Sequence, residues 1–353
     1  MAHDRSCFFG NSPSQAVATY DLRQTVTHPS ANFDEDVKRF VCSNFYVDDG
    51  LTSVQTPEEP VSLMKRTQEA LKLNGNLRLH KITSNSIEVL TAFPSEDLAK
   101  DIKELDLGFD ETPIQRSLGL YWDLKHNAFT FNVCSDEKPF TRRSILSTVN
   151  SIYDPLGFLA LVIIQGRHLL RTMMSQTVDW DEPLSEDYLT DWEQWKKSLQ
   201  HLRDLQIPRT YTGSINTSTK TELHIYSDAS QKAIAAVAYL KTYSSDGNTQ
   251  LGFVFEKVKL APVKGHIIPR LELCAAVLAV EIYSLVREQL DTEIHTTQFY
   301  IDIKVVLGYI HNEQRRFHIY VSNRVERIRK ITTPNQWQFI RNDLNAADEG
   351  TRF

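Results

Sequence analysis

The sequence predicts an α+β region and a helical segment, followed by an α/β domain with a mixed five-stranded sheet. Three observations support this fold class. The first 133 residues mix short apolar runs with one clear helix start. The segment from 134 to 208 carries mainly helical periodicity. Beyond residue 222, the apolar patterns follow the order three strands, helix, strand, two helices and strand, which is typical of a sheet flanked by helices.

Length and composition place the chain among ordinary folded proteins. It has 353 residues, of which 41% are hydrophobic and 24% charged, enough for two or three domains. The formal net charge of −6 differs from that of a basic DNA-binding module. The longest apolar run, Phe158 to Ile164, is too short to cross a bilayer. We expect no membrane association and an intracellular location, in the cytoplasm with the nucleus left open. Single cysteines without metal or redox spacing agree with a reducing compartment: Cys7, Cys42, Cys134 and Cys274.

Residues 1–133 are expected to hold a β-hairpin and a helix. Asp48-Asp49-Gly50 separates two apolar runs, and Asp-Gly in that position is a hairpin signal. Thr56-Pro57-Glu58-Glu59 has the cap, proline and early acids of a helix start. The strands predicted here are Phe40–Val47, Leu51–Val54, Leu77–Ile82 and Ser117–Trp122.

Two further boundaries follow from composition. The helical segment 134–208 contains the turn Asp154-Pro155-Leu156-Gly157, and a Ser- and Thr-rich stretch at 209–221 is expected to be a linker. The domain 222–353 begins after it. Its predicted strands are Leu223–Ser227, Ala233–Leu240, Leu251–Leu260, Gln298–Ile303 and Trp337–Ile340. Three helices are predicted in this domain. A long helix begins near Pro269, a short helix contains Val305 and Tyr309, and a third helix covers Tyr320–Ile331.

Four acids of this last domain stand where one sheet could gather them. Asp228 and Asp302 end predicted strands, Glu272 lies in the first turn of the long helix, and Asp348 follows the last strand. Taken singly, each has an ordinary explanation: a turn cap, a favourable helix dipole or a solvated loop. Taken together, converging carboxylates require a divalent cation. Two such ions, Mg²⁺ or Mn²⁺, about 3.5–4 Å apart can promote phosphodiester hydrolysis.

The order Asp, Glu, Asp, Asp on these elements resembles ribonuclease H. The sequence motifs around the acids are similar to those of the polymerase (Pol) polyprotein of Bel/Pao-type long-terminal-repeat retrotransposons. The matching segments are Ile268–Leu273, Asp302 with Val305–Ile310, Arg316–His318 with Asn323–Val325, and Asn345–Asp348. The resemblance implies a two-metal endonuclease that acts on RNA–DNA hybrids, with the four acids as metal ligands. Ile303 and Ala346 depart from the family, which usually has Ser and Pro there, and no histidine stands shortly before Asp348.

The first region resembles the end of a reverse transcriptase palm, and the helical segment its thumb or connection. Tyr46-Val47-Asp48-Asp49 is similar to the polymerase active-site turn, which implies Asp48 and Asp49 as metal ligands. The flanking matches are Phe9–Ser14 with Ala16, Asn76–Leu79 with Ser84–Ser86, Leu118–Asp123, and Asp154–Gly157. The family places a further catalytic aspartate and the fingers before Gly10, so we expect RNA-directed DNA polymerase activity to be lost. Other segments of a Pol polyprotein are expected partners.

Basic residues suggest how nucleic acid could be held. Arg315, Arg316, Arg324 and Arg327 cluster near Tyr320 and could contact a phosphate backbone, although a solvated helix face containing Glu326 fits equally well. Three hypotheses remain open: an active ribonuclease H beside a polymerase remnant, an inactive remnant that binds nucleic acid, and a decayed polyprotein fragment.

Overall fold

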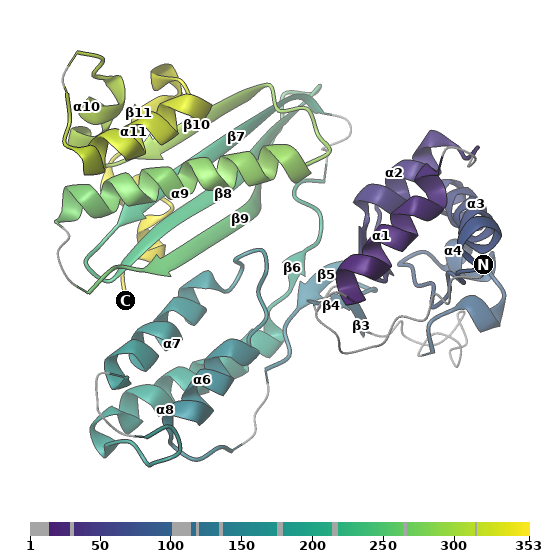
Figure 1. Ribbon diagram of the computed structural model, residues 1–353, viewed down its shortest axis with the longest axis horizontal. Helices are drawn as coiled ribbons and strands as arrows, with labels where there is room; N and C mark the ends of the chain where they lie inside the picture. Colours follow the sequence, from purple (N-terminus) through teal and green to yellow (C-terminus); the bar gives the residue numbers. More distant parts are fainter. Residues whose placement is uncertain are drawn as a thin grey trace, which may run out of the picture. The chain divides into compact units, whose positions relative to one another are not determined.

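A computed structural model describes residues 14–28, 32–100, 114–117, 120–133, 137–174, 179–213, 218–263, 267–314 and 316–353. The chain forms two compact units (Figure 1). Unit 1 comprises Met1–Phe131 and Gln206–Pro208, and unit 2 comprises Asn132–Leu205 and Arg209–Phe353. Among the described residues, no helix combines the length and the apolar character that crossing a bilayer requires.

Unit 1 begins with a small helical core. Helices α1 (Ser14–Thr27), α2 (Glu35–Ser43) and α3 (Glu58–Gly75) pack together, and α3 confirms the predicted helix. The strand predicted at Phe40–Val47 is wrong in its first half, which is the end of helix α2, and only Phe45–Tyr46 form a strand. The apolar side chains of α2 recur at helical spacing and are buried: Val37, Phe40 and Val41.

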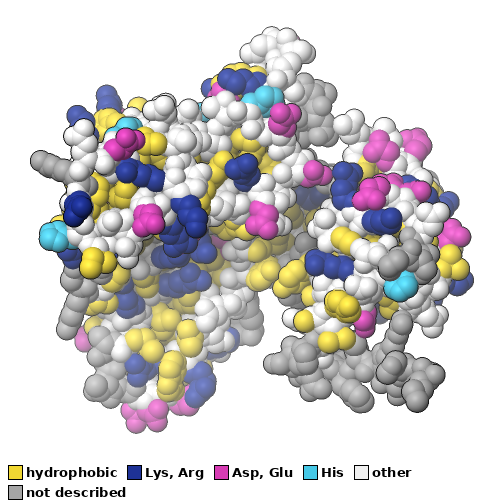
Figure 2. Space-filling view, turned by 45° about the horizontal axis from the view of Figure 1, so that its top comes forward, with side chains coloured by type: hydrophobic (Ala, Val, Ile, Leu, Met, Phe, Trp, Pro, Cys, Tyr) yellow, Lys and Arg dark blue, Asp and Glu magenta, His cyan; other side chains and the backbone are white. Residues whose placement is uncertain are grey.

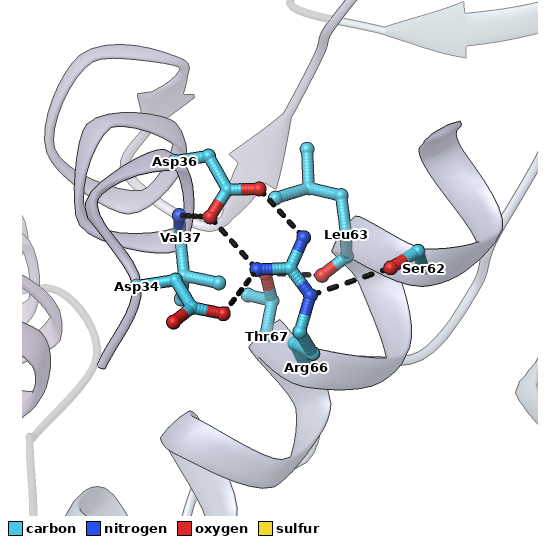
Figure 3. A network of polar contacts seen from close by, with 7 residues as sticks. All are labelled: Asp34, Asp36, Val37, Ser62, Leu63, Arg66 and Thr67. Atoms are coloured by element: carbon cyan, nitrogen blue, oxygen red, sulfur yellow. Dashed lines mark hydrogen bonds and ion pairs between the residues drawn. The ribbon is translucent and has the colours of Figure 1, made fainter. Parts of the chain in front are cut away.

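An arginine fixes the start of α2 to α3 (Figure 3). The Arg66 guanidinium donates to Asp34 at 2.7 Å and to both carboxylate oxygens of Asp36 at 2.8 and 2.6 Å. The hydrogen bond from Arg66 holds the pKa of Asp36 below its usual range. Acids at this helix start also suit the helix dipole, which explains why the segment is helical.

The predicted hairpin is present but short. Strands β1 (Phe45–Tyr46) and β2 (Asp49–Gly50) pair antiparallel, and Val47 with φ 58° and Asp48 form the turn. Residues Leu51–Val54, predicted as the second strand, have no regular structure. The hairpin therefore places Asp48 in the turn and Asp49 at the start of β2, and both residues are exposed.

A second sheet completes unit 1. It has the antiparallel order β3 (Ile114–Ser117), β4 (Leu120–Asp123), β5 (Ala128–Thr130), β6 (Ile207–Pro208). Helix α4 (Ile87–Thr91) and the 3-10 turn η1 (Ser95–Asp97) lie before it. The strand predicted at Leu77–Ile82 is reduced to one bridge between Ile82 and Leu98.

The helical segment of unit 2 confirms its predicted character. It contains α6 (Arg142–Ser151), α7 (Ala160–Met173), η2 (Glu186–Tyr188), α8 (Leu189–Ser198) and η3 (Leu199–Asp204). Helix α8 lies so close to α7 that a Cβ on Gly166 would be 2.3 Å from Cζ2 of Trp195, so only glycine fits there. The Trp195 indole N–H donates to the Val162 carbonyl at 2.9 Å.

The predicted mixed five-stranded sheet is confirmed, with the order β11-β10-β7-β8-β9. Strands β7, β8 and β9 are antiparallel, whereas β10 runs parallel to both β7 and β11. Strand β7 starts at Ser218, inside the stretch predicted to be a linker. The elements are β7 (Ser218–Ala229), β8 (Ala233–Ser244), β9 (Thr249–Leu260), α9 (Ile268–Gln289), β10 (Thr296–Ile301), α10 (Lys304–His311), α11 (Ile319–Ile331), η5 (Pro334–Gln336), β11 (Trp337–Phe339), η6 (Asn342–Leu344) and η7 (Asp348–Gly350).

Helices cover both faces of this sheet. Helix α9 packs on the face that presents Leu223, Ile225 and Ala236. Helix α7 packs on the face that presents the alternate residues of β8 with Val258 of β9: Ala233, Ala235 and Val237. The helical segment 142–204 is therefore one of the layers that build the core of unit 2.

Candidate metal centre

Two of the predicted acids meet because neighbouring parallel strands end together. The register pairs Ile301 of β10 with Ser227 of β7, so Asp302 and Asp228 follow at the same edge of the sheet. Asp228 is buried, and Asp302 is partly buried. The alternation of side chains along β7 turns Ser227 into the core beneath α9 and leaves Asp228 on the other face.

The first turn of α9 supplies the third acid. Glu272 is 3% exposed although it is charged in water, and its neighbours Leu271 and Leu273 are core residues. One carboxylate oxygen each from Asp228, Glu272 and Asp302 lies within 4.8 Å of the other two. Among the described residues this is the one group of three or more acids, histidines or cysteines placed for a metal ion.

Crowding and burial disfavour the charges of this acidic cluster, a name used below for Asp228, Glu272 and Asp302. Burial raises the pKa of Asp228 to about 6, and the charges of Asp302 and Asp348 add to the rise. Burial, with the charges of Asp228 and Asp302, raises the pKa of Glu272 to about 9. The Oε2 atom of Glu272 is buried and has no hydrogen-bond partner.

The fourth predicted acid lies beside the cluster. Asp348 is buried in η7, which packs against β7 and β8. Its carboxylate pairs with Arg352 at 2.6 Å. Burial raises the pKa of Asp348, while the charge of Arg352 lowers it and that of Asp302 raises it. Asp348 thus adds negative charge beside the cluster, and the Arg352 guanidinium partly neutralises it.

Amide and hydroxyl groups hold the carboxylates in place. The Thr351 hydroxyl donates to Oδ2 of Asp228 and also to the Asp348 carbonyl. Asn345 donates to the Ser227 carbonyl at 3.0 Å and to Oδ2 of Asp302 at 3.4 Å. With its amide nitrogen facing the acids, Asn342 donates to Asp302 at 3.0 Å and to Asp348 at 3.1 Å, and it accepts from Arg352 at 2.9 Å.

The donor set fits a hard divalent cation. Every candidate ligand is a carboxylate oxygen, the type that Mg²⁺ and Mn²⁺ prefer. The Oε2 atom of Glu272, which has no hydrogen-bond partner, also favours a cation here, because a buried charged oxygen is costly unless a positive group lies next to it. A cation among the three carboxylates would remove the repulsion that raises the pKa values of Asp228 and Glu272.

The hairpin acids are placed very differently. Asp48 and Asp49 are exposed, and Tyr46 beside them is 67% exposed. Neither acid belongs to a group of three potential ligands among the described residues. The flanking Phe9–Pro13 segment, part of the polymerase resemblance, lies outside the described residues.

Basic side chains gather on unit 2, as Figure 2 shows on the face turned to the viewer. Arg324 stacks at 3.6 Å over the Tyr320 ring, and Arg270 lies over the same ring at 5.1 Å. Arg327 instead pairs with Glu281 at 3.0 Å. Arg316 is exposed, and Arg315 lies outside the described residues. The charge of Arg327 is therefore partly neutralised by Glu281 of α9.

Sequence reasoning missed the residues that orient the acids. Asn345 was part of a recognised motif, and an amide three residues before a candidate ligand could have been flagged as its support. Thr351, Asn342 and Arg352 gave no comparable signal. Thr351 stands 123 residues from the Asp228 carboxylate that it contacts.

Comparison with known proteins agrees with this geometry. Residues 141–303 match the family model of the Pao retrotransposon-like RNaseH-like domain, which confirms the predicted resemblance to Pao retrotransposons over this stretch. The match contains Asp228, Glu272 and Asp302, and it also contains helices α6 to α8. No curated protein matches the chain.

Several solved structures are similar to parts of the chain. Ribonuclease H1 from the halophilic archaeon Halobacterium salinarum is 15% identical, with 36% of this chain and 92% of that chain covered and a TM-score of 0.26. LC11-RNase H1 from compost, in complex with an RNA/DNA hybrid, is 14% identical, with coverages of 37% and 92% and a TM-score of 0.23. The prototype foamy virus protease–reverse transcriptase is 14% identical, with a TM-score of 0.22; the alignment covers 97% of this chain and 39% of that chain. The ribonuclease H-like fold of unit 2 follows from its strand order and from the matched family.

Proposed function

We propose, from the match of residues 141–303 to the family model of the Pao retrotransposon-like RNaseH-like domain, that unit 2 hydrolyses the RNA strand of RNA–DNA hybrids. The observation that carries this proposal is the acidic cluster, in which three carboxylates from distant parts of the chain approach within 4.8 Å at one edge of the sheet. A fold does not by itself imply an activity, so the proposal depends on this site.

Asp228, Glu272 and Asp302 would hold Mg²⁺ or Mn²⁺, with Asp348 beside them. When bound, such ions lower the pKa of a coordinated water and stabilise negative charge on a phosphodiester. The protein's own contribution is to keep the carboxylates in place. Thr351, Asn345 and Asn342 do so by donating hydrogen bonds to them.

Nucleic acid would be held by the basic face of unit 2. We assign this role to Arg316, Arg324 and Arg327 within the described residues, and to Arg315 beyond them. The carboxylate of Glu281 neutralises part of the charge of Arg327, so Arg324 is the stronger candidate of the two. Unit 1 is proposed to be a reverse transcriptase palm remnant whose Asp48 and Asp49 do not support polymerisation.

Cleavage of a labelled RNA–DNA hybrid by the purified full chain tests the proposal. We expect cleavage that requires Mg²⁺ or Mn²⁺ and is lost in Asp228→Asn, while hybrid binding stays intact or strengthens because one negative charge is removed. Arg315→Ala with Arg316→Ala should instead weaken binding and flatten its salt dependence. Cleavage by Asp228→Asn at the parent's rate would disprove the metal-site assignment.

A second candidate function is nucleic-acid binding without hydrolysis. It is favoured by the pair of arginines stacked on Tyr320, since guanidinium groups held over a ring contact phosphates with little loss of side-chain freedom. Hybrid binding by the parent chain, without metal-dependent cleavage, would favour this function over the first.

A further inference from the structure

A cavity lies at the end of the unit 2 sheet where β10 begins, whereas the acidic cluster lies where β10 ends. It has a volume of about 370 Å³. Its walls come from the last turns of α9, the connection to β10 and Gln336 of η5. This volume is at the lower end of the range for small-molecule sites, roughly 300–1,000 Å³.

The lining of this cavity is rich in hydrogen-bond donors and carries no carboxylate. Arg287 lines it, and among the described residues no acid lies within ion-pair distance of its guanidinium. One N–H of Arg287 donates to the Tyr283 hydroxyl at 3.5 Å, and the guanidinium lies 6.0 Å from the centre of that ring. The remaining donors of this guanidinium are available to a ligand, because arginine has five.

A histidine in the lining is fixed as a donor. The Thr221 backbone N–H donates to Nδ1 of His295 at 3.2 Å, and the His295 backbone N–H donates to the Thr221 carbonyl at 2.9 Å. Because Nδ1 accepts, neutral His295 carries its proton on Nε2, which can donate to a ligand. The hydroxyls of Thr292 and Thr296 add two further donors to the same lining.

We propose that this cavity binds the phosphate group of a small phosphorylated ligand, through Arg287 and His295. A guanidinium matches the geometry of phosphate oxygens, and charge-assisted hydrogen bonds of this kind are roughly twice as strong as neutral ones. The C-terminal carbonyls of α9 disfavour an anion through the helix dipole. The charge of Arg287 in the last turn of that helix offsets this effect. The site is independent of the proposed hydrolysis.

Thermal unfolding and calorimetric titration of the full chain test the proposal. Inorganic phosphate should raise the melting temperature above that in chloride at equal ionic strength, and adenosine monophosphate should bind whereas adenosine should not. Arg287→Ala should weaken phosphate binding about tenfold or more, and Arg287→Lys less. Arg167→Ala is the matched control, because it removes the same charge from an exposed position on α7 that does not line the cavity.

The melting temperature of Arg287→Ala in chloride reports whether that variant is folded. Phosphate binding that is lost in Arg287→Ala and kept in Arg167→Ala supports the site. Three results would overturn it: no stabilisation by phosphate beyond that by chloride, equal binding of adenosine and its monophosphate, or equal loss of binding in both arginine variants.

Discussion

The acidic cluster of unit 2 and the hairpin of unit 1 both place carboxylates next to strand ends, yet within the described residues only the first brings three acids together. Asp228 and Asp302 belong to long strands in a five-stranded sheet, and α9 brings Glu272 to them. Asp48 and Asp49 follow a strand of two residues and stay exposed. Adjacent acids in the sequence therefore matter less than a fold that brings distant acids together. Burial and repulsion of such acids disfavour their charges, and a bound cation offsets both effects.

The largest expected effect concerns Glu272, the most perturbed member of the cluster. In Glu272→Gln, divalent metal affinity should fall by more than the roughly 10–100-fold typical for loss of an outer-shell partner. Without metal, the free energy of unfolding of this variant should be about 1–3 kcal/mol higher than that of the parent, because a neutral amide replaces a buried carboxyl group that has no partner. Metal titration and chemical denaturation in a chelator measure the two effects.

Glu288→Gln, an exposed position on the same helix, is the control for Glu272→Gln. Retained metal affinity in Glu272→Gln, or a less stable metal-free protein, would remove Glu272 from the cluster. This result would also weaken the contrast with the hairpin, because burial of the acid would then have no connection with cation binding.

The fold of unit 2 could be predicted from sequence because its elements are long and clearly periodic. The apolar residues of helix α9 recur with the helical period, and those of strands β7 to β9 recur with the strand period of two. The segment around Phe40 is short, and its apolar residues form a run that fits a strand as well as a helix. The contacts of Asp34 and Asp36 with Arg66 of α3 decide between the two, and these are tertiary.

The acids of the site were predictable, whereas their supports were not. Each acid interrupts or borders an apolar pattern and is visible locally. Thr351 and Asn342 act across the fold, on residues far away in the chain. No local periodicity records such contacts, so they required the structure.

Glu256, a half-buried acid outside the cluster, sharpens the comparison, because an acid that does not converge with two others should change stability only. Burial, with the charge of Asp154, raises the pKa of Glu256 from its ordinary 4.5 to about 7. Its stabilising contribution is therefore complete below pH 4.5 and is lost as the pH rises through 7, at a cost of about 3 kcal/mol.

Glu256→Gln should reduce the pH dependence of unfolding by this amount, leaving the part that comes from Asp228 and Glu272, and should leave divalent metal affinity unchanged. Urea denaturation between pH 5 and 8 measures it. Glu193→Gln, exposed on α8, should keep the parent's profile. A parent whose stability rises over the same pH range would show that Glu256 does not control it.

A smaller effect is expected at the residue that orients Asp228. Thr351→Val removes the hydroxyl that donates to Asp228 but keeps the shape of the side chain. Metal affinity should fall by about 10–100-fold, whereas Thr351→Ser should retain most of it. Titration with Mn²⁺ compares the three proteins. Loss of affinity in Thr351→Ser with retention in Thr351→Val would point to packing of the methyl group as the cause and contradict the role of the hydroxyl.

The smallest effect is expected at the hairpin. Asp48 is exposed and belongs to no group of potential ligands among the described residues, so Asp48→Asn should change the free energy of unfolding by no more than about 0.5 kcal/mol. Mn²⁺ titration should give the same stoichiometry for parent and variant, because the metal is held by the acidic cluster. Primer extension on an RNA template should be undetectable for both. A binding step or an extension product that is present in the parent and absent in Asp48→Asn would show that the hairpin acids act as ligands, and that an exposed turn needs no sheet to form a metal site.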